Sequence, residues 1–96
     1  MKKIIYLGKE EGAFTCGSFY HYLQSLGVNK IDGHGISPND GREITIDFVY
    51  EKSGLRIDFL YRSKDKNGPV TVLASGEEKD ISEFERVILE ENKRRL

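Results

Sequence analysis

The sequence predicts an α+β domain of two layers, with the element order β-α-β-β-β-α, a largely antiparallel sheet and both helices on one face of it. Strict apolar alternation between residues 44 and 61 predicts a hairpin. Apolar residues at helical spacing predict one helix after Thr15 and another after Ser82. The 96 residues hold no repeat and no linker, so we expect a single domain that spans residues 1–96.

The first predicted strand runs from Lys3 to Leu7 and is closed by Gly8. Its residues are β-branched or aromatic, and from Ile4 onward they are apolar on both alternating faces. A strand that is apolar on both faces is typical of the interior of a protein. We therefore expect this strand to be covered on both sides.

The first predicted helix begins after Thr15, whose hydroxyl suits an N-cap, and ends at Gly27, which suits a helix stop. Between them, apolar residues recur at helical spacing: Phe19, Tyr22, Leu23 and Leu26. The pattern then ceases, because residues 27–42 hold four glycines and a proline. We expect a long loop there, or a short strand around Val28 and Ile31, and loops of this length often carry function.

The central hairpin can be assigned a register if its turn lies at Ser53 and Gly54. The pairs expected on one face are Tyr50 with Ile57, Phe48 with Phe59, and Ile46 with Tyr61. The pairs expected on the other face are Glu51 with Arg56 and Thr45 with Arg62. Because every pair keeps its face, the register is self-consistent. A second turn around residues 66–69 leads to a further strand, 70–75.

The last predicted helix follows Ser82, which forms a potential capping box with Glu85. Its apolar stripe consists of Ile81, Phe84, Val87 and Ile88. Acidic residues near its start and the basic run 93–95 near its end match the polarity of the helix dipole. Both helices can therefore cover one apolar face of the sheet.

The charge balance argues against several classes of partner. Fifteen Lys and Arg face sixteen Asp and Glu, which gives a net charge of −1 and no general attraction to nucleic acid or anionic lipid. One cysteine cannot form an internal disulfide, and no apolar run is long enough for a membrane span or a signal peptide. We expect a cytoplasmic protein without a membrane partner, and nucleic-acid binding ranks last among the functions that we consider.

No set of residues forms a recognisable catalytic, metal-binding or cofactor-binding motif, so we expect no cofactor and favour a protein without enzymatic activity. One alternative remains open. Cys16 at the start of a helix, with Asp32 and His34 in the glycine-rich segment, is compatible with a small-ligand site or a cysteine-dependent enzyme. Such chemistry requires the thiol and the imidazole to lie close together.

The main candidate site is the outward face of the sheet. There, three apolar residues interrupt a polar surface: Val49, Leu60 and Leu73. Charged residues surround them on the same face, among them Arg56, Asp58 and Arg62. A small apolar patch ringed by mixed charge is typical of a protein interface. We therefore expect an interaction module, for a protein partner or for self-association, that uses this open face or an edge strand.

Overall fold

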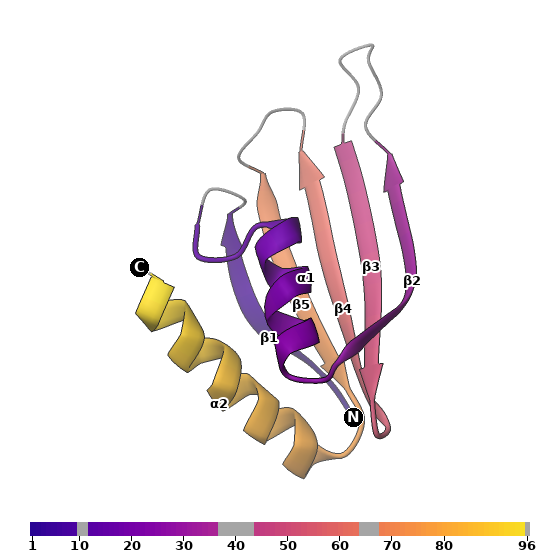
Figure 1. The fold of residues 1–96 in the computed structure, drawn as a ribbon, viewed down its shortest axis with the longest axis vertical. Helices are drawn as coiled ribbons and strands as arrows, with labels where there is room; N and C mark the ends of the chain where they lie inside the picture. Colours follow the sequence, from indigo (N-terminus) through magenta and orange to yellow (C-terminus); the bar gives the residue numbers. More distant parts are fainter. Residues whose placement is uncertain (10–11, 37–43, 64–67, 96) are drawn as a thin grey trace.

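The computed structural model describes residues 1–9, 12–36, 44–63 and 68–95. These residues form the following elements: β1 (Lys2–Lys9), α1 (Cys16–Ser25), β2 (Asn29–Ile36), β3 (Ile44–Lys52), β4 (Leu55–Ser63), β5 (Pro69–Ser75) and α2 (Glu78–Arg95). The strands build one sheet in the order β1-β5-β4-β3-β2, and every pair of neighbours is antiparallel (Figure 1). The predicted single α+β domain is confirmed, with β2 as an added strand.

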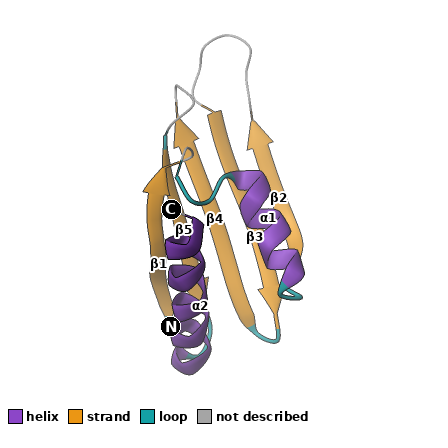
Figure 2. Cartoon of the chain, turned by 60° about the vertical axis from the view of Figure 1, so that its left-hand side comes forward, coloured by secondary structure: helices purple, strands orange, loops and turns teal. Residues whose placement is uncertain are grey.

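Both helices lie on the same face of the sheet, as predicted (Figures 1 and 2). Phe19 and Leu23 of α1 and Ile88 of α2 are buried in one apolar cluster with the strands beneath them. The strand residues of this cluster include Tyr50, Ile57, Phe59, Val70, Val72 and Ala74. No described element covers the opposite side, which we call the open face.

The β3–β4 hairpin has the predicted register in every pair, from Glu51 opposite Arg56 to Thr45 opposite Arg62. Its turn residues, Ser53 and Gly54, have φ angles of 49° and 84°. Two left-handed residues in succession form the type I′ turn, whose twist matches that of paired strands. The turn and the alternation thus specify the same register.

Strand β2 lies in the segment for which we expected a long loop or a short strand, and the second alternative is correct for residues 29–36. It pairs with β3, with an irregularity between Lys30 and Asp32. A Cβ atom at Gly33 would stand 2.6 Å from Lys30 Cε and 2.7 Å from Phe48 Cδ1. This glycine therefore permits close side-chain packing in a strand, although glycine usually indicates a loop. Residues 37–42 of the expected loop lie outside the described residues.

Strand β1 contradicts one prediction, because it lies at an edge of the sheet and is covered on one side only. A bulge between Ile4 and Tyr6 lets Ile5 and Tyr6 both join the core beneath the helices. Ile4 and Leu7 instead pair with open-face positions of β5 and are 49% and 69% exposed. The expected second cover is absent from the described chain.

Helix α1 has the predicted ends. The Thr15 hydroxyl accepts a hydrogen bond from the Ser18 N–H at 3.1 Å, and the Ser18 hydroxyl accepts one from the Thr15 N–H at 2.9 Å. At the other end, Gly27 has a φ of 77°, and its N–H donates to the Gln24 carbonyl at 3.0 Å. Side-chain caps at the start and a left-handed glycine at the end therefore define this helix.

Helix α2 begins at Glu78, four residues before the expected N-cap, so the prediction of a capping box at Ser82 is wrong. The Ile81 N–H already donates to the Glu77 carbonyl at 3.0 Å, and Glu78 and Asp80 place negative charge in the first turn. Glu85 instead forms an ion pair with Lys3 of β1 at 2.8 Å. This pair links the helix to the edge of the sheet.

Candidate functional site

The open face is built by alternate residues of the strands, which the register arranges in rows across the sheet. One row consists of Val49, Asp58, Leu73 and Ile4. The next row consists of Asp47, Leu60, Thr71 and Leu7. Residues on diagonal positions of neighbouring strands are about 7–8 Å apart and within reach of long side chains. The two rows therefore form one continuous surface from β1 to β3.

Apolar side chains run diagonally through these two rows and form what we call the apolar stripe: Ile4, Leu7, Leu73, Leu60 and Val49. Ile4 and Leu7 are exposed, while Leu60 and Leu73 are half-buried. Val49, which we expected to lie on the outward surface, is only 7% exposed. It therefore adds little accessible area to the apolar stripe. These residues form a connected apolar surface, which is the candidate interaction site of this chain.

A charged group lies beside the apolar stripe. Arg56 donates to both carboxylate oxygens of Asp58, from Nη2 at 3.2 Å and from Nε at 3.3 Å. The hydrogen bond and the charge of Asp58 raise the pKa of Arg56, and the charges of Asp47 and Asp32 add to the effect. Asp58 is only 8% exposed, although no described helix covers it. The open face thus combines a fixed charged pair with apolar groups.

Arg62, the remaining predicted interface residue, is exposed and pairs across the strands with Thr45. Together with Leu60, Pro69 and Thr71 it lines a shallow hollow of about 210 Å³ on the same side of the sheet. The six predicted interface residues therefore share one face. Sequence reasoning missed Ile4 and Leu7, because regular alternation places them on opposite faces and the bulge that brings them to one face has no signal in the sequence.

The alternative site does not assemble in the structure. Asp32 and His34 lie together in β2, with His34 Nε2 3.9 Å from Asp32 Oδ1, and both side chains are exposed. Cys16 is the first residue of α1 and packs, half-buried, against the core in the helix layer. The register places His34 opposite Asp47 on the open face, so the sheet separates the imidazole from the thiol.

Among the described residues, no three His, Cys, Asp or Glu side chains are placed to hold a metal ion. As far as the described chain extends, neither helix combines the length and the apolar character needed to cross a membrane. No protein-family model matches this sequence, and no curated protein or solved structure shows significant similarity to it.

Proposed function

We propose that this protein is a small interaction module that associates with a second copy of itself through the open face. The observation that carries the proposal is the contrast in β1, whose sequence is that of a strand covered on both sides. The helices cover Ile5 and Tyr6, whereas Ile4 and Leu7 remain exposed. A second copy supplies the missing cover.

A second copy is the occupant that matches the charges of the face. One row across the sheet consists of Lys2, Ser75, Arg56, Glu51 and Asn29. Its members on β1 and β3, Lys2 and Glu51, carry opposite charges. A two-fold axis along the strands, between β5 and β4, sets β1 of each copy opposite β3 of the other. Lys2 of one copy then approaches Glu51 of the other, and Ile4 approaches Val49 in a neighbouring row. The net charge of −1 adds little repulsion between copies.

The size of the face sets the expected strength. Four strands about 4.8 Å apart and about 25 Å long overlap in this arrangement and present roughly 480 Å² per copy. Stable interfaces of standard size bury about 800 Å² per partner, so this one belongs to the small class. We expect a reversible dimer with a dissociation constant in the micromolar range or weaker. The single cysteine fits a reducing compartment, and we propose the cytoplasm as its location.

Sedimentation velocity over a concentration series tests the proposal. The protein should shift from monomer to dimer with concentration, and Leu60→Lys should keep it monomeric. The new amine would face the Asp47 carboxylate across the strands, which supports the fold of the monomer. In a dimer, the introduced lysines of the two copies would place like charges at the interface.

Gln24→Lys provides the control, because it makes the same charge change on an exposed position of α1 in the helix layer. This variant should dimerise as the original chain does, and circular dichroism should show all three proteins folded. A chain that stays monomeric at about millimolar concentration, where even weak specific contacts form, refutes the proposal. Unchanged dimerisation of folded Leu60→Lys refutes it equally.

A further inference from the structure

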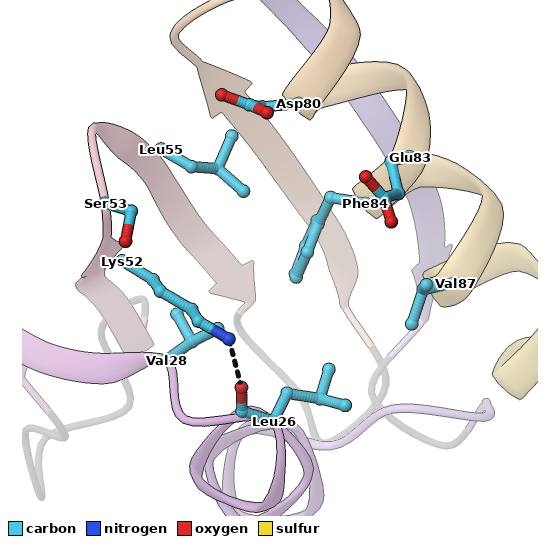
Figure 3. A pocket seen from close by; sticks show the side chains of 9 residues that line it. All are labelled: Leu26, Val28, Lys52, Ser53, Leu55, Asp80, Glu83, Phe84 and Val87. Atoms are coloured by element: carbon cyan, nitrogen blue, oxygen red, sulfur yellow. Dashed lines mark hydrogen bonds between the residues drawn. The ribbon is translucent and has the colours of Figure 1, made fainter.

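The helix layer contains a groove that the proposed dimer does not use. It lies between the C-terminal end of α1, the β3–β4 turn and the first half of α2, and its volume is about 310 Å³ (Figure 3). Its apolar lining consists of Leu26, Val28, Leu55, Phe84 and Val87. The groove is on the opposite side of the sheet from the apolar stripe, so the two surfaces can be occupied independently.

The two helices are linked at the end of the helix layer that lies away from the groove. There, the Arg95 guanidinium lies 5.0 Å from the ring centre of Phe14 and 5.5 Å from that of Tyr22. Glu91, which is 6% exposed, accepts a hydrogen bond from Arg95 Nε at 2.8 Å and fixes this position. Helix α2 is therefore anchored beside α1 near residue 95 and leaves the groove open near residue 80.

The rim of the groove favours a cation. Asp80 and Glu83 line the α2 side, and neither forms a hydrogen bond or an ion pair within the described chain. The opposite side is the C-terminal end of α1, which has no basic residue in its last turn and carries partial negative charge. Lys52 donates from Nζ to the Leu26 carbonyl at 2.9 Å (Figure 3) and offsets that charge in part.

We propose that this groove binds a peptide segment of another protein in which a large apolar side chain stands close to a lysine or arginine. The apolar side chain fills the space above Leu55 and Phe84, and the basic residue pairs with Asp80 and Glu83. Lys52 uses one of its three N–H donors on Leu26, so a second can bind a peptide carbonyl. A groove of about 300 Å³ lies at the lower end of ligand-site volumes, which suits one or two side chains.

Nuclear magnetic resonance titration of the full chain with two short peptides tests this inference. Both peptides are acetylated and amidated, with a central phenylalanine followed two residues later by arginine in one and by glutamate in the other. Amide signals near Leu26, Leu55 and Phe84 should shift, and the arginine peptide should bind about fivefold more tightly at low salt. The combined change Asp80→Asn and Glu83→Gln should remove that preference.

Two further variants separate the groove from the open face. Val87→Ala should weaken both peptides, because it shortens the apolar wall without disfavouring the helix. Leu60→Lys should leave both affinities unchanged, since it alters only the proposed dimer face. The inference is overturned if the two peptides bind equally, if the shifts map to the open face, or if about 5 mM peptide, ample for a weak millimolar site, causes no shift.

Discussion

The two faces of the sheet differ sharply, although the same strands build both. Phe59 is fully buried, and its ring centre lies 5.1 Å from that of Phe19 in α1. Leu60, the next residue of β4, is half-buried beside Asp47 on the open face. Adjacent residues of a strand point to opposite faces of the sheet. A shift of one position along the strand therefore moves a side chain from the core to the surface. The alternation of the strands therefore assigns each residue to a face, and the helices cover the face that carries Phe59.

Truncation of neighbouring residues should show the largest difference between the faces. Phe59→Ala should lower the free energy of unfolding by about 3–5 kcal/mol, because it removes a fully buried ring and leaves a cavity. Leu60→Ala should lower it by about 1 kcal/mol or less in the monomer. Urea unfolding at low protein concentration measures both changes without a contribution from self-association. Equal losses would contradict the assignment of the two faces.

The ion pairs that the buried Glu91 forms with Arg94 and Arg95 should make stability depend on acid pH. Hydrogen bonds from Arg94 lead the causes that lower the pKa of Glu91 from 4.5 to about 2, and Arg95 adds to them. Because the folded pKa lies below the unfolded one, this stabilisation is complete above about pH 4.5 and declines as the pH falls toward 2. The stability difference between the original chain and Glu91→Gln should therefore shrink over this range.

Glu90→Gln is the matched control for that experiment, since Glu90 pairs with Arg86 at 3.3 Å on the exposed side of the same helix. Exposed pairs of this kind contribute little to stability. Thermal unfolding between pH 6 and about 2.5 compares the three proteins across the pH window that linkage defines. A stability difference for Glu91→Gln that stays constant with pH would show that Glu91 acts through packing and not through its charge.

Tyr50 should give the smallest effect, and one of opposite sign. Its hydroxyl is buried in the described chain without a hydrogen-bond partner, and burial raises its pKa, with Cys16 and Tyr20 nearby. An unsatisfied buried hydroxyl is costly, so Tyr50→Phe should raise the free energy of unfolding by about 1 kcal/mol. Tyr20, whose hydroxyl accepts a hydrogen bond from Gln24 Nε2 at 2.9 Å, supplies the control. Tyr20→Phe should not stabilise the protein, and a loss of stability in Tyr50→Phe would contradict the explanation.

Local signals were sufficient where the physical cause is local. The turn at Ser53 and Gly54 fixes its hairpin, and Thr15 and Gly27 fix the ends of α1, because each acts on backbone atoms a few residues away. The start of α2 was less accessible to prediction. Ser82 has the chemistry of an N-cap, yet the helix continues through it, and Glu85 pairs with Lys3, which is distant in the sequence.

Sequence patterns were sufficient to predict the fold class, the hairpin register and the six interface residues of β3, β4 and β5 that share the open face. These follow from period-two and period-3.6 patterns, which depend only on backbone geometry. The tertiary structure alone decided that β1 is an edge strand, that Cys16 and His34 lie on different sides of the sheet, and that a groove separates the helices at one end. Such features depend on which distant elements come together. Local sequence patterns do not specify contacts between residues that are far apart in the chain.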